Sequence, residues 1–107
     1  MPTSAQAATG TVRTGAGFCL VRDQDIQKNC VYRDPDRIYA HPTAGCYKAV
    51  ATTPGSAVYI DNELNTTIRV HAGPDCKGGA IDSLPSGDMS FYLKRAFPDG
   101  VSFYVPQ

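Results

Sequence analysis

Proline and glycine recur along the whole chain, and their spacing limits the fold more than any other sequence feature. The 107 residues contain 8 prolines and 10 glycines, so that no stretch long enough for a stable helix avoids these breakers and keeps helical apolar spacing. Short runs rich in β-branched and aromatic residues lie between turn signals, as in all-β sandwiches and barrels. We therefore predict strands at residues 17–21, 30–32, 37–39, 57–60, 66–71, 80–81, 89–93 and 101–105.

Alternation of apolar and polar residues is clear in the run 67–71. Ile68 and Val70 fall on one face of a strand, and the opposite, polar face carries Thr67, Arg69 and His71. The run 101–105 alternates in the same way. The segment 22–28 is the one place where we expect a single helical turn or a loop, because acidic residues lead and a lysine trails.

Charge and hydropathy exclude two classes of partner. Ten basic side chains balance 10 acidic ones and the two signs are interspersed, so no basic stripe could follow the phosphates of a nucleic acid. The longest apolar runs, such as 57–60, are far shorter than the roughly 20 residues of a membrane-spanning helix. We expect neither a nucleic-acid nor a membrane partner, and a chain of this length predicts one domain, which we expect to be a monomer.

The first residues indicate export. Residues 5–7 read Ala-Gln-Ala, the A-x-A form after which signal peptidase cuts, although no apolar segment precedes them. We interpret residues 1–10 as a signal-peptide remnant with a flexible arm, and residues 11–107 as a single all-β domain. The protein is then secreted and extracellular.

The cysteine content agrees with that compartment. An even number of cysteines in a short exported chain indicates a disulfide framework, and four cysteines allow three connectivities. No C-x2-C pair is present, and the two histidines are not spaced to complete a zinc site. These residues alone leave the connectivity open among Cys19, Cys30, Cys46 and Cys76.

No group of residues points to catalysis. A nucleophilic hydrolase needs Ser, Cys or Thr beside an oriented histidine, and only His41 and His71 could serve as the base. Because no complete constellation emerges, we expect that the protein is not an enzyme and has no cofactor. Calcium is the one candidate ion, since Asp61 and Asn62 would begin a loop of oxygen ligands to which Asp88 could add a second arm.

A longer motif spans residues 56–78, which read SAVYIDNELNTTIRVHAGPDCKG, and continues as LPSG at 84–87. It resembles the secreted actinobacterial proteins grouped with Streptomyces-type metalloprotease inhibitors. The resemblance implies a small, disulfide-stapled Greek-key sandwich of the βγ-crystallin-like kind. The family pattern of an aromatic residue, a cysteine and a glycine would fall on His71, Cys76 and Gly78. The glycine would adopt a positive φ that lets the hairpin fold over the sheet, and His71 would pack beneath it.

The resemblance also implies a disulfide pairing and an internal duplication. It favours a bridge between Cys46 and Cys76, which leaves Cys19 to pair with Cys30. A first copy of the motif would span residues 17–28. The sandwich would then consist of two related halves, residues 11–50 and 51–107.

Similarity to this group implies that the protein inhibits a secreted peptidase. A rigid loop, held extended by a neighbouring disulfide, would enter the peptidase cleft with little entropy left to lose. We expect that loop at 34–45 or at 73–79, because each adjoins or contains a cysteine. The candidate contact residues are Asp34, Pro35, Asp36, His41, Pro42, Pro74, Asp75 and Lys77.

Two other functions are alternatives. A cell-wall or glycan-binding module would stack sugars on exposed tyrosines and could be stabilised by calcium. Among the aromatic residues of the predicted strands, we expect Phe91 and Phe103 in the core and leave the position of Tyr104 open. The remaining alternative is a secreted antimicrobial protein or toxin.

Overall fold

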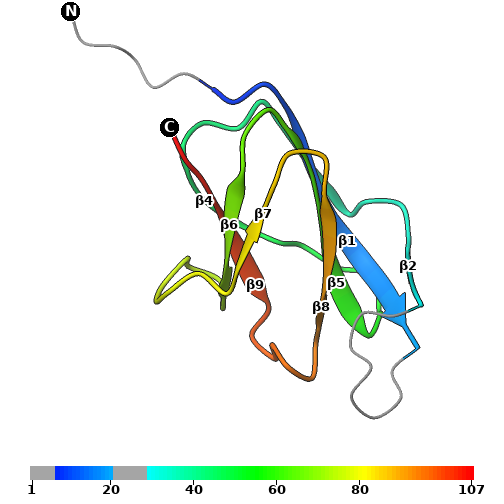
Figure 1. Ribbon diagram of the computed structural model, residues 1–107. Helices are drawn as coiled ribbons and strands as arrows, with labels where there is room; N and C mark the ends of the chain where they lie inside the picture. Colours follow the sequence, from blue (N-terminus) through cyan, green and yellow to red (C-terminus); the bar gives the residue numbers. More distant parts are fainter. Residues whose placement is uncertain (1–6, 21–28) are drawn as a thin grey trace, which may run out of the picture.

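The protein folds into two antiparallel β-sheets that pack against each other (Figure 1). The computed structural model describes residues 7–20 and 29–107, in which nine strands and no helix are found. The all-β prediction is confirmed, and this part of the chain offers no helix that could cross a membrane. The turn predicted at 22–28, the end of the strand predicted at 17–21 and most of the proposed first motif copy lie outside the described residues.

The first sheet, sheet A, is built around β1 (Gly10–Cys19). One edge of β1 pairs with β5 (Ala57–Leu64), and β8 (Met89–Leu93) completes the sheet beside β5. The other edge of β1 pairs with β3 (Arg37–Ala40) along its first half and with β2 (Cys30–Tyr32) near its end. The strands β2 and β3 thus act as one interrupted edge strand.

The second sheet, sheet B, contains the four remaining strands. Its order is β4 (Gly45–Lys48), β9 (Val101–Val105), β6 (Ile68–Ala72) and β7 (Asp82–Leu84). Residues 11–50 supply β4 to this sheet, whereas residues 51–107 supply β5 and β8 to sheet A. The two parts of the chain are therefore interleaved in both sheets, and the Greek-key, crystallin-like assignment stays a prediction.

The hydrophobic core lies between the two sheets. Ile68 and Val70 of β6 and Phe103 of β9 are fully buried there, which confirms the faces predicted from alternation. The Phe103 ring lies 5.4 Å from that of Tyr39 and 5.5 Å from that of Tyr47, so β3 and β4 contribute aromatic packing to the same core. Burial of this apolar surface, at about 25 cal/mol per Å², is the main favourable contribution to folding.

A second, aromatic layer covers the outer face of sheet A. Tyr59 is 1 % exposed although its strand neighbours face the core, because its ring lies over Gly15, where a Cβ would approach the ring to 2.8 Å. The Tyr59 hydroxyl donates a hydrogen bond to the carbonyl of Arg33 at 2.9 Å. Phe91 covers Gly17 in the same way, so the prediction that Phe91 belongs to the core between the sheets is wrong.

Several strand bounds differ from the prediction. β1 begins at Gly10 rather than at 17, β4 was not predicted, β5 continues through Leu64, and β7 follows the predicted run at 80–81. These segments are rich in Gly, Asp and Asn, whose low strand propensity is overridden here by pairing with neighbouring strands. The backbone N–H groups of Ala8 and Thr9 donate to the Pro42 carbonyl and to Asn65, so residues 8–10 of the predicted arm belong to the sandwich.

Both expected disulfides are present. Cys19 and Cys30, which are register partners at the end of the β1–β2 pair, are bonded to each other. Cys46 of β4 is bonded to Cys76 in the loop after β6. Two disulfides in a small β domain are typical of extracellular proteins.

Candidate functional site

The segment 34–45 is not the single exposed loop that the sequence predicts, because β3 occupies its centre. The Asp36 carboxylate accepts hydrogen bonds from the backbone N–H groups of Thr52 and Thr53, at 2.9 and 3.2 Å, and from the Thr53 hydroxyl at 2.9 Å. Desolvation acts to raise the pKa of Asp36, but these hydrogen bonds outweigh it and leave the pKa below its ordinary value. Asp36 therefore fastens a turn, while Asp34 beside it is exposed.

His41 and Pro42 also hold the fold together. The backbone N–H of Gly10 donates to His41 Nδ1 at 3.2 Å, and the carbonyl of Pro42 accepts from Ala8 at 3.0 Å. Pro42 is buried, so its prediction as a contact residue is wrong. These two residues fix the start of β1 against the segment between β3 and β4.

The second predicted loop, residues 73–79, has the expected accessibility. We call it the strap; Figure 1 shows it in yellow, projecting beside β6. Pro74, Asp75 and Lys77 are all exposed on it. Three of the predicted contact residues are thus brought together on one short loop.

The strap is anchored at its first residue, in its middle and just beyond its last residue. The Gly73 N–H donates to the Gly100 carbonyl at 2.8 Å, and the Ile81 N–H donates to the Val70 carbonyl at 2.7 Å. In between, Cys76 is bonded to Cys46, and its N–H donates to Ser102 Oγ at 2.8 Å. The strap therefore runs from β6 over β9 to β4.

Residues beneath the strap are shielded from water. Ser102 and His71 are register partners that point away from the core, yet Ser102 is fully buried and His71 is 9 % exposed. Gly78 has φ +74°, so the expectation that this glycine takes a positive φ is confirmed. The burial of His71 agrees with the predicted position beneath the hairpin. Among the described residues, His71 Nδ1 is buried without a hydrogen-bond partner.

The calcium candidates do not form the predicted loop, because Asp61 and Asn62 lie within β5. Asn62 is fully buried, and its side chain is engaged by the Thr66 and Leu84 carbonyls and by the Leu64 N–H. Asp88, by contrast, lies exposed in the turn before β8. In the part of the chain that the structure describes, no three His, Cys, Asp or Glu side chains are grouped to hold a metal ion.

Asp61 instead forms a carboxyl pair with Glu63 on the outer face of sheet A. Partial burial, followed by the hydrogen bond and the charge of Glu63, raises the pKa of Asp61 to about 6, while the positive charge of Arg13 acts in the opposite direction. Arg13 is the register partner of Asp61 on β1. The pair can take up a proton slightly below neutral pH.

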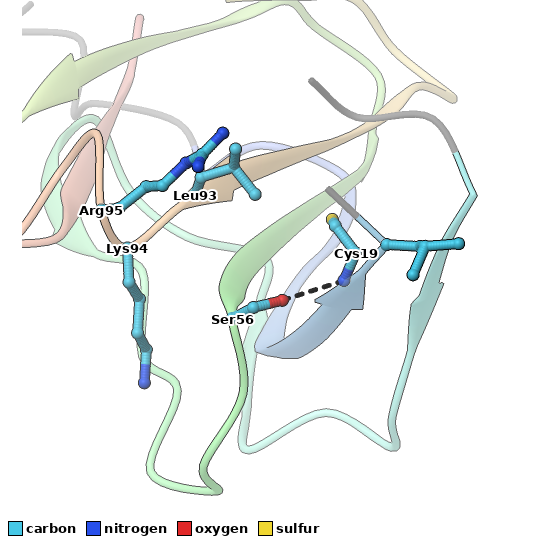
Figure 2. Close-up of a pocket in the computed structure, with 6 residues that line it drawn as sticks. Cys19, Ser56, Leu93, Lys94 and Arg95 are labelled. Atoms are coloured by element: carbon cyan, nitrogen blue, oxygen red, sulfur yellow. Dashed lines mark hydrogen bonds between the residues drawn. The ribbon is translucent and has the colours of Figure 1, made fainter. Parts of the chain in front are cut away.

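A hollow of about 500 Å³ lies where the end of β1 meets the turn after β8 (Figure 2). Leu93 provides an apolar wall of the hollow. In Figure 2 the Arg95 side chain extends toward Leu93, whereas the Lys94 side chain points away from Leu93. Ser56 Oγ accepts a hydrogen bond from the Cys19 N–H at 2.9 Å, and no histidine lines the hollow. These lining residues do not form a nucleophile–base pair.

The sequence reasoning missed a groove on the outer face of sheet B, lined by Arg69 and Tyr104 among others. Alternation alone places both side chains outward, but their juxtaposition depends on the pairing of β6 with β9. Comparisons with protein-family models, with curated proteins and with solved structures found no match to this chain.

Proposed function

We propose that the protein is a secreted peptidase inhibitor and that the strap is the part that enters the peptidase cleft. The observation that carries this proposal is the anchoring of an exposed loop by one disulfide and by hydrogen bonds at Gly73 and Cys76. A loop fixed in this way loses little conformational entropy on binding, which favours tight association through a small contact area. The resemblance of residues 56–78 to secreted metalloprotease inhibitors supports the same function.

The backbone of the strap defines how it would act. Gly73, Cys76 and Gly78 have φ values of +83°, +54° and +74°, so the strap is a series of turns and not the extended segment that the sequence predicted. An extended substrate strand has negative φ angles throughout. We therefore infer that the strap blocks the cleft as a rigid plug and is not cleaved as a substrate.

The strap presents one carboxylate and one ammonium group to a partner. Asp75 and Lys77 are exposed on either side of Cys76 and make no hydrogen bond or ion pair with another described residue. Their charges are therefore free to pair with groups of the peptidase. Pro74 restricts the backbone before them, because its ring fixes φ near −65°.

The proposal is tested with a panel of a thermolysin-type metallopeptidase, subtilisin, trypsin and papain. Each enzyme is incubated with a slight molar excess of the protein, and residual activity and the intact mass of the protein are measured. We expect strong inhibition of one class with no cleavage in the strap. Full activity across the panel, or rapid cleavage between 73 and 79, would contradict the proposal.

A pair of double variants separates the strap from the rest of the surface. Asp75→Ala with Lys77→Ala removes one carboxylate and one ammonium from the strap. Asp88→Ala with Lys94→Ala removes the same groups from exposed turns elsewhere. We expect the first variant to weaken inhibition at least tenfold and the second to leave it unchanged, and equal inhibition by both would refute the assignment to the strap.

A further inference from the structure

The outer face of sheet B carries a groove beside the strap. A hollow of about 520 Å³ is lined by Thr66, Thr67, Arg69, Ser83, Tyr104 and Pro106. A smaller hollow of about 190 Å³, near the two ends of the described chain, shares Thr66 and Pro106 with it. The larger hollow has the size of typical small-ligand sites, which span about 300–1,000 Å³.

Strand register builds the floor of this groove. Ser83 of β7 pairs with Arg69 of β6, Arg69 pairs with Tyr104 of β9, and Tyr104 pairs with Cys46 of β4. Since register partners share a face of a sheet, these side chains form one row across the outer surface. The row ends at the cysteine that anchors the strap.

Tyr104 is the aromatic surface of the groove. It is 42 % exposed, whereas Phe103 beside it in β9 is fully buried in the core. An exposed tyrosine ring offers a flat apolar surface on which the C–H face of a sugar ring can stack. The ring is held in place by a central strand, because β9 lies between β4 and β6.

Arg69 supplies the charge of the groove. It is exposed, and within residues 7–20 and 29–107 it forms no ion pair or side-chain hydrogen bond. Among the residues that the structure describes, no aspartate or glutamate side chain lines either hollow. The planar guanidinium presents several N–H donors and matches a carboxylate in a bidentate arrangement.

The remaining lining side chains are small and polar. The hydroxyls of Thr66, Thr67 and Ser83 make no hydrogen bond to a described residue, so they can pair with hydroxyl groups of a ligand. This polar lining disfavours a wholly apolar ligand, because such a ligand would bury these hydroxyls without partners. A single arginine also differs from the basic track that binds a phosphate backbone.

We infer that the groove binds an acidic oligosaccharide, that is, a sugar chain bearing carboxylate groups. One ring stacks on Tyr104, its carboxylate pairs with Arg69, and neighbouring hydroxyls hydrogen-bond to Ser83 and the threonines. This binding site is separate from the exposed residues of the strap. It would place the protein on an anionic glycan while the strap stays accessible.

The test is an NMR titration of the isotope-labelled protein with tetragalacturonate, compared with its fully methyl-esterified form. Amide shifts should concentrate at Arg69, Ser83 and Tyr104, and esterification should weaken binding at least tenfold because it removes the charge that Arg69 recognises. No shift at millimolar ligand, or equal binding of the esterified form, would overturn the inference. Shifts confined to another surface would also overturn it.

Variants test the two contacts separately. Tyr104→Ala should abolish binding while Tyr104→Phe retains it, because stacking needs the ring and not the hydroxyl. Arg69→Gln should weaken binding of the acidic form at least tenfold and leave any weak binding of the ester unchanged. Tyr32→Ala, at a tyrosine on sheet A that is 59 % exposed, is the matched control and should bind like the unmodified protein. Equal affinities of Tyr104→Ala and Tyr32→Ala would refute the site, as would a tetra-aspartate peptide that binds the groove as tightly as the sugar.

Discussion

Replacement of Asn62 by alanine should destabilise the fold more than most single substitutions. The Asn62 side chain is fully buried; its Nδ2 donates to the Thr66 and Leu84 carbonyls, both at 2.9 Å, and its Oδ1 accepts from the Leu64 N–H at 3.0 Å. Each such bond contributes about 1 kcal/mol net, so the three together predict a loss of about 3 kcal/mol. Domains of this size have a total stability of roughly 5–15 kcal/mol, so the loss is a large fraction of it.

Urea unfolding with both disulfides intact measures this loss. Asn62→Ala should shift the midpoint at unchanged slope, which indicates a change in stability rather than in the surface exposed on unfolding. The control is Asn65→Ala, which removes one exposed hydrogen bond of 3.2 Å to Thr9 and should lower stability by less than about 1 kcal/mol. If the two variants unfold at the same urea concentration, the buried network does not stabilise the fold as argued.

Thermal unfolding of the same variant tests whether Asn62 binds calcium. If Asn62 were a calcium ligand, added calcium would raise the melting temperature of the unmodified protein but not that of Asn62→Ala, because a ligand that binds only the folded state stabilises it by mass action. The structure predicts no such difference, since the Asn62 oxygen is already bound to the Leu64 N–H.

Two further predictions concern sheet A. The pKa of Asp61 is raised to about 6, so its protonation contributes stability that is fully present below the unfolded value of 3.8 and is lost as pH rises through 6. Asp61→Asn should therefore raise the melting temperature at pH 7.5 but not at pH 3. An equal effect at both pH values would contradict this. Gly15→Ala should lower the free energy of unfolding in urea by about 1–3 kcal/mol, because the added Cβ would lie 2.8 Å from the Tyr59 ring. The control is Gly79→Ala, whose Cβ meets no atom within 4 Å. Equal stabilities of the two variants would refute the close packing at Gly15.

Local patterns in the sequence predicted part of the fold. The strands at 30–32, 89–93 and 101–105 match β2, β8 and β9, and alternation identified the inward residues Ile68 and Val70. Residues 10–16 of β1 escaped prediction because Gly10 and Gly15 interrupt their pattern. Gly15 and, at the start of the predicted run, Gly17 leave room for the rings of Tyr59 and Phe91, which come from distant strands. Only the tertiary pairing explains why such a segment is a strand.

The sequence predicted the part of the candidate site whose residues are neighbours in the chain. Pro74, Asp75 and Lys77 are close in sequence, and a neighbouring cysteine marked their loop as anchored. The burial of Pro42 and the hydrogen bonds that Asp36 accepts were not predictable locally, because they depend on partners that lie elsewhere in the chain.

The groove on sheet B could not be predicted from local sequence patterns for the same reason. Alternation places Arg69 and Tyr104 outward on their strands, but it does not show that the strands are neighbours. The two residues share a row only through the register of β6 with β9.

Removal of each disulfide in turn tests whether the disulfide-anchored strap inhibits a peptidase. Cys46→Ala with Cys76→Ala frees the strap, whereas Cys19→Ala with Cys30→Ala leaves it anchored. The chain-entropy estimate gives similar stability losses, about 3.7 and about 3 kcal/mol. With folding of both variants verified by NMR, we predict at least tenfold weaker inhibition by the first and unchanged inhibition by the second. Equal inhibition by the two folded variants would contradict the claim.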